Sequence, residues 1–149
     1  MKEGFYKTDS FKNRIIKITL SLLMLCIGGL IYIVFRDESL LMFDWFENIG
    51  ISQHIKLFRG IFGTEWMYSW VKYSLPDGLW LIAYMLIIDA IWNGSNSISF
   101  YIFIYALPFF ALLSEMLQYF GLFSGVFDWI DVICYSLAIL LYILIKIIK

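Results

Sequence analysis

Long apolar stretches separated by short polar breaks dominate the pattern of this chain. A bilayer core of roughly 30 Å needs about 20 apolar residues in a helix. Four stretches approach that length, and they cover residues 15–35, 75–92, 97–120 and 132–148. The pattern therefore predicts an all-α integral membrane protein, with a four-helix bundle in a single domain over residues 1–149.

The first stretch follows several basic residues, as the apolar part of a secretion signal would. We interpret it as a retained helix, because it is longer than that apolar part and charged residues at 36–38 follow it without a small-residue cleavage site. Lys17 lies close enough to its end for the ammonium group to reach water. Gly28 and Gly29 predict that another helix approaches this one closely.

The segment between the first two spans, residues 36–74, is too long and too aromatic for a plain loop. Apolar residues recur in it at helical spacing, at Ile51, Ile55, Phe58 and Phe62. Aromatic residues at this density favour the headgroup level of a membrane. We expect one or two amphipathic helices on the outer surface, and a lid over a lipid-facing groove is the alternative.

Composition narrows the class of protein. The chain is 62% apolar and 15% charged, with a mean hydropathy of +0.81, whereas soluble domains are about 45–50% apolar and about 25% charged. These values exclude a disordered chain and argue against a soluble globule. The net charge of −1 argues against a nucleic-acid partner, and no such partner is expected. Membrane lipids are the expected surroundings.

Basic residues near the membrane predict the orientation. Several precede the first span, and Lys146 and Lys149 close the last one. The segment 36–74 also contains basic residues, but an even number of spans places both termini on one side. We expect both termini in the cytoplasm and the chain in the cytoplasmic (inner) membrane.

Polar and ionisable residues within or at the edge of spans are costly and tend to mark function. In the predicted topology, the outer ends of the second, third and fourth spans carry Asp77, Glu115, Gln118, Asp128 and Asp131. The pair in the third span and the pair in the fourth have i, i+3 spacing, so each pair shares one helix face. Three helices therefore present carboxylates at one depth.

Two interpretations of these acids stay open. Aspartate is a favoured N-cap and complements the helix dipole, so Asp77 and one of Asp128 and Asp131 can be caps alone. Glu115 lies near the C-terminal end of its helix, where the dipole disfavours a negative charge, and we favour a site there. Such carboxylates can act as general acid and base or hold Mg²⁺ or Ca²⁺. The pattern decides neither enzymatic activity nor a cofactor.

The remaining polar signals are weaker. Asp89 and Asn93 form a smaller polar set near the inner end of the second span. With His54 as its single histidine, the chain cannot assemble a zinc site from the usual ligands, and no residue is assigned as a metal ligand.

A longer motif covers the end of the third span and the start of the fourth. It reads Glu115-x-x-Gln118-x-Phe120, then Gly125-x-Phe127-Asp128-x-x-Asp131-Val132-Ile133. This pattern resembles the signature of the VanZ-like family of small bacterial membrane proteins, specifically over residues 114–137. The chain departs from it with Tyr135 where the family has Asn, and with Ala138 where it has Gly.

The resemblance implies a protein of the bacterial cell envelope and, through the family's association with glycopeptides, antibiotic resistance. It adds Tyr135, which can still donate a hydrogen bond, to the candidate ligand-binding residues. The first hypothesis is an outer site for a lipid headgroup, a lipid-linked cell-wall precursor or a glycopeptide-related ligand. The alternatives are a structural subunit with a membrane protein partner, and a small transporter with stations at Asp89 and Glu115.

Overall fold

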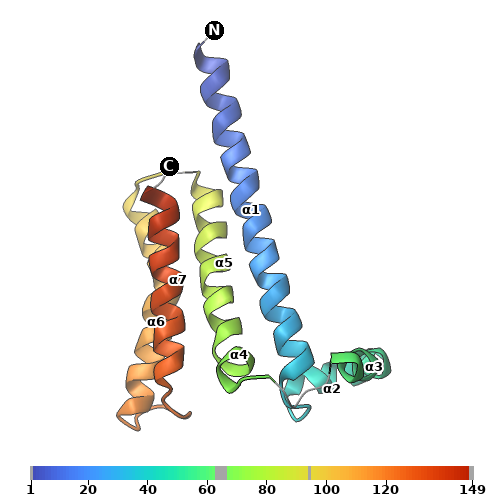
Figure 1. Ribbon diagram of the computed structural model, residues 1–149. Coiled ribbons are helices and arrows are strands. Elements are labelled where there is room, and N and C mark those ends of the chain that lie inside the picture. Colours follow the sequence, from blue (N-terminus) through green and yellow to red (C-terminus); the bar gives the residue numbers. More distant parts are fainter. Residues whose placement is uncertain (1, 63–66, 94, 148–149) are drawn as a thin grey trace.

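The chain is helical throughout most of its length in a computed structural model (Figure 1). The structure describes residues 2–62, 67–93 and 95–147, with side chains from residue 11 onward, and no strand occurs in these ranges. The helices are α1 (Lys2–Phe35), α2 (Leu41–Asn48), α3 (Ser52–Phe62), α4 (Ser69–Tyr73), α5 (Leu75–Trp92), α6 (Ile98–Tyr119) and α7 (Trp129–Ile147). The predicted end of the last span at residue 148 and Lys149 lie outside the described residues.

Four of the helices are long and apolar enough to cross a membrane. They cover Phe11–Phe35, Leu75–Trp92, Ile98–Tyr119 and Trp129–Ile147. The prediction of an all-α, multi-pass membrane protein is confirmed. The third span starts one residue later than predicted, because Ser97 is an N-cap whose Oγ accepts the Phe100 N–H at 3.2 Å.

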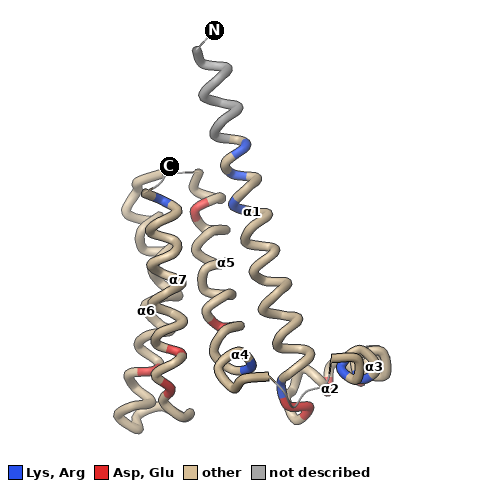
Figure 2. The backbone as a smooth tube through the Cα atoms, in the orientation of Figure 1, with Lys and Arg blue, Asp and Glu red and all other residues tan. Residues whose placement is uncertain are grey.

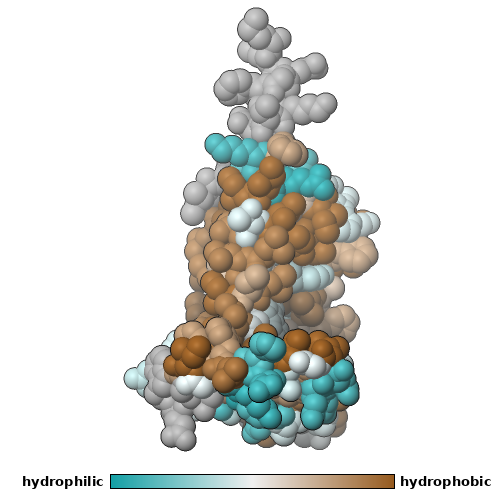
Figure 3. Space-filling view, turned by 90° about the vertical axis from the view of Figure 1, so that its right-hand side faces the viewer, coloured by the Kyte–Doolittle hydropathy of each residue, from teal (hydrophilic) through white to brown (hydrophobic). Residues whose placement is uncertain are grey.

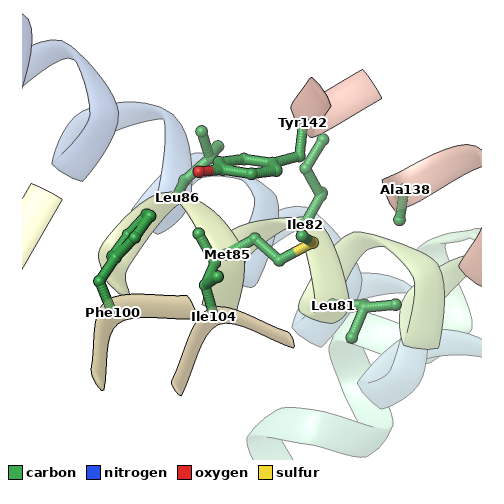
Figure 4. Packing of buried hydrophobic residues seen from close by; sticks show 8 residues of the cluster. All are labelled: Leu81, Ile82, Met85, Leu86, Phe100, Ile104, Ala138 and Tyr142. Atoms are coloured by element: carbon green, nitrogen blue, oxygen red, sulfur yellow. The ribbon is translucent and has the colours of Figure 1, made fainter. Parts of the chain in front are cut away.

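Helix α5 is the central helix of the bundle. It packs against α1 on one side and against α6 and α7 on the other (Figure 1). Half of the residues in its span are buried, compared with 11% in the α7 span. The core joins α5 to both later helices (Figure 4), and its members are Leu81, Ile82, Met85, Leu86, Phe100, Ile104, Ala138 and Tyr142.

The outer surface of the bundle is apolar between a hydrophilic end and an end where hydrophilic and apolar side chains mix, as Figure 3 shows for one face. In water such a surface would be costly, but lipid tails are as apolar as these side chains. Helix association then depends on close packing and on hydrogen bonds between helices. The contact between α1 and α5 has both features.

Gly28 of α1 faces the indole ring of Trp80 on α5. A Cβ atom at Gly28 would lie 2.5 Å from Trp80 Nε1, whereas one at Gly29 would meet nothing within 4 Å. The predicted close approach therefore occurs at Gly28 alone. One turn further along α1, the Tyr32 ring packs on Trp80 with centroids 5.3 Å apart.

The described part of segment 36–74 contains three short helices at the end of the bundle away from both termini (Figure 1). Helix α3 is held to the end of α1 by Arg59, which donates to the carbonyl oxygens of Ile33 at 2.5 Å and Arg36 at 2.9 Å. These carbonyls follow the last helical hydrogen bonds of α1 and need donors. The position of α2 and α3 on a membrane surface stays a prediction.

Candidate functional site

One acidic residue of α5 and the acidic residues of α6 and α7 lie at one end of the bundle, whereas a second acidic residue of α5 lies at the other end, beside the basic residues of α1 (Figure 2). Asp77 is in the first turn of α5, and Asp131 is in the first turn of α7. Glu115 is in the last turns of α6 and is only 5% exposed. Both Asp131 and Glu115 lie within electrostatic range of Asp77. The structure thus brings together acids from three helices.

Glu115 and Asp128 connect the end of α6 to the start of α7. The backbone N–H of Asp128 donates to Glu115 Oε2 at 3.3 Å. The Asp128 side chain accepts the N–H of Ile130 on its Oδ1 at 2.8 Å. Asp128 therefore caps α7, which explains why this helix begins at Trp129 rather than at the predicted residue 132.

Asp131 has no such capping partner. Its Oδ1 is buried and accepts no hydrogen bond from any described residue. A buried carboxylate oxygen without a partner is costly, because it loses water without a replacement. None of the four clustered carboxylates, on Asp77, Glu115, Asp128 and Asp131, forms an ion pair within the described ranges.

The two remaining predicted residues take different places. Tyr135, one turn after Asp131, lies within electrostatic range of Asp77, Asp131 and Glu115. The Gln118 side chain instead packs over the α6–α7 loop, where a Cβ atom at Gly125 would lie 2.8 Å from its amide carbon. Gly125 adopts a φ of 140°, so a side chain there would be strained as well as crowded.

Two further polar residues lie beside the acids and were not among the predicted site residues. The Arg36 guanidinium interacts with Asp77 but lies between the rings of Tyr32, at 5.0 Å, and Tyr73, at 4.9 Å. Ser74 is the N-cap residue of α5, yet its Oγ is buried and has no hydrogen-bond partner in the described part of the chain. The i, i+4 spacing of Tyr32 and Arg36 in the sequence indicated that the Arg36 guanidinium could lie over the Tyr32 ring.

A groove of about 460 Å³ opens between the end of α6 and the start of α7. Its walls are apolar and aromatic apart from one charged residue, Glu115. The lining residues are Leu112, Glu115, Met116, Tyr119, Phe120, Phe127, Trp129 and Val132. Hydrophobic periodicity could not predict this groove, because the groove depends on how far the two helices and their loop lie apart in the fold.

The second polar set includes a partner from α1 that the sequence pattern did not assign to it. Asp89 forms an ion pair with Lys17, with Nζ 2.6 Å from Oδ2, and both side chains are largely buried. Asn93 is the C-cap of α5 in the left-handed conformation, with a φ of 50°. The partner of Asp89 therefore comes from α1, and the Lys17 ammonium is held inside the protein rather than directed to water.

Among the described residues, no group of three or more His, Cys, Asp or Glu side chains is arranged to hold a metal ion.

Comparison of the chain with family models, curated proteins and solved structures finds no match. The carboxylate site and the groove beside it are therefore the features of the molecule that bear on its function.

Proposed function

We propose that the chain is a VanZ-like envelope protein whose carboxylate site binds the polar part of an envelope molecule. A lipid headgroup, a lipid-linked cell-wall precursor and a glycopeptide-related ligand are the candidate classes. One observation carries the proposal: the buried, unpartnered carboxylate oxygen of Asp131 lies in a cluster with Asp77 and Glu115. The motif shared with the VanZ-like pattern includes Glu115 and Asp131.

Buried carboxylates need hydrogen-bond donors or positive charge to offset the loss of water. Carboxylates at the edge of a membrane span are costly, and neighbouring carboxylates repel one another. Helix capping accounts for Asp128, since its Oδ1 accepts the Ile130 N–H, but it does not account for Asp131 or Glu115. A ligand that brings hydrogen-bond donors or positive charge would relieve both costs.

The proposal places the site on the outer face of the cytoplasmic membrane. Both chain termini lie at the other end of the bundle (Figure 1), where α1 carries Lys12, Arg14 and Lys17. The rule that basic residues stay inside then directs the carboxylates outward. Envelope molecules are accessible from that side.

The test is the ligand that stays with the protein. The full chain is purified in mild detergent beside the variants Asp131→Asn and Asp44→Asn, and bound amphiphiles are extracted and identified by mass spectrometry. Asp44 is an exposed acid of α2 and serves as the matched control. We expect the wild type and the control to retain one amphiphile that Asp131→Asn retains at least about tenfold less, corresponding to about 1.4 kcal/mol. An identical set in all three proteins would contradict the proposal.

A further inference from the structure

We infer that the α6–α7 groove binds a membrane lipid, with an acyl chain along its apolar walls and a protonated primary amine of the headgroup at Glu115. The inference rests on the proposed function and names the class of ligand. It combines the shape of the groove with the charge at its wall.

The groove has the size and the lining of a site for an amphiphile. Its volume of about 460 Å³ lies within the range of roughly 300–1,000 Å³ that is usual for small-molecule sites. Leu112, Met116 and Val132 supply apolar wall, while Glu115 is the one carboxylate among the residues that line it. A ligand with a long apolar part and one charged group matches a groove that has apolar walls and one carboxylate.

Aromatic rings gather at the loop end of the groove. The Phe127 ring packs edge-on against Tyr119, at 5.2 Å between centroids, and against Trp129, at 4.9 Å. Tyrosine and tryptophan favour the headgroup level of a bilayer. Aromatic faces also attract ammonium groups, so this end suits a cationic headgroup.

The charge near the groove selects a cation over an anion. Glu115 interacts electrostatically with Asp128 and Asp131, and none of these three has an ion-pair partner in the described part of the chain. Phosphate alone would be repelled by this set. Glu115 Oε2 accepts one backbone N–H, so the carboxylate can still accept bonds from a further donor. A primary ammonium offers three donors, whereas a quaternary ammonium offers none.

The experiment uses the full chain and defined lipids. Delipidated protein is mixed with equimolar dioleoyl phosphatidylethanolamine, phosphatidylcholine and phosphatidylglycerol, and native mass spectrometry records which lipid stays bound. We expect several-fold more phosphatidylethanolamine than either other lipid. Glu115→Gln should lose this preference, Glu47→Gln on α2 should keep it, and Val132→Trp, which fills the groove, should retain less of all three lipids.

A second measurement does not depend on folding of a variant. With wild-type protein, N-acetylated phosphatidylethanolamine, whose amine is blocked, should be retained no better than phosphatidylglycerol. Equal retention of all lipids by the wild type, a preference for phosphatidylcholine, or a preference that persists in Glu115→Gln would overturn the inference. If the lipid preference fails but retention of an amphiphile still depends on Asp131 in the purification test, the proposed function is supported and only the amine lipid is rejected. If neither result is obtained, the proposed function and the amine lipid are both rejected.

Discussion

Lys17 on α1 and Asp89 on α5 form a largely buried ion pair, with Nζ 2.6 Å from Oδ2. The pair lies at the end of the bundle opposite the carboxylate site. Within a membrane span a lone charge is costly, and pairing between helices is the usual way to hold one there. The pair therefore joins α1 to α5 at this end of the bundle.

Removing one charge of this pair should destabilise the protein more than removing both. Lys17→Met leaves Asp89 buried without a partner, and we expect a loss of about 3–5 kcal/mol in the free energy of unfolding. Lys17→Met combined with Asp89→Leu should recover most of it. Unfolding by SDS titration in mixed micelles measures both, with the exposed Lys12→Met as the control. A double variant less stable than Lys17→Met would contradict this account.

Two adjacent glycines of α1 should respond in opposite ways to alanine. Gly28→Ala places a methyl group against Trp80, and overpacking of this kind costs about 1–3 kcal/mol. Gly29→Ala meets no neighbour and should be neutral or stabilising by up to about 1 kcal/mol. Thermal unfolding in detergent compares the two variants. Equal melting temperatures would show that α1 and α5 are not in close contact at Gly28.

The hydrogen bond between α1 and α5 should make a small contribution. Ser21 Oγ donates to the carbonyl oxygen of Ala83 at 2.8 Å, and Ser21 is fully buried. We expect Ser21→Ala to cost about 0.6 kcal/mol and at most about 1.7 kcal/mol, as is typical between membrane helices. Ser136→Ala is the matched control, because Ser136 bonds Val132 in its own helix and is exposed. A larger loss in the control would refute this assignment.

Arg59 should hold α3 to the end of α1. Arg59→Gln removes the two hydrogen bonds to carbonyl oxygens and the ion pair with Glu38, whose atoms lie 3.4 Å apart. Bonds to charged groups are worth about 1.5–3 kcal/mol each, so amide hydrogen exchange over residues 41–62 should rise strongly. Exchange in the α5 span should stay unchanged. Lys56→Gln, an exposed change on the same helix, should have no such effect, and unaltered exchange in Arg59→Gln would reject the anchor.

The predicted orientation can be read from cysteine labelling in intact cells. With Cys26 and Cys134 replaced by alanine, Leu122→Cys in the exposed α6–α7 loop should react with a membrane-impermeant maleimide. Lys12→Cys near the other end should react only after permeabilisation. The opposite labelling would place the carboxylate site in the cytoplasm.

The spans were predictable because each helix in a bilayer must satisfy its own backbone hydrogen bonds over a set length. The ends of the spans were less predictable, because capping residues determine where a helix begins. Asp128 caps α7, so this helix begins before the start of the apolar stretch. The depth of Asp77, Glu115 and Asp131 also followed from the order of the spans. Whether their side chains would meet did not, because that depends on the rotation of each helix about its axis.

Local chemistry along the chain is therefore enough to establish a four-span membrane protein with acids at one end. The partner of Asp89, the anchor at Arg59 and the groove beside Glu115 come from contacts between residues far apart in the chain. Hydrophobic periodicity is weak on helices that are apolar on every side, so it does not tell which face meets which neighbour. Small residues and buried polar pairs make that choice, and their effect appears only once the helices are packed.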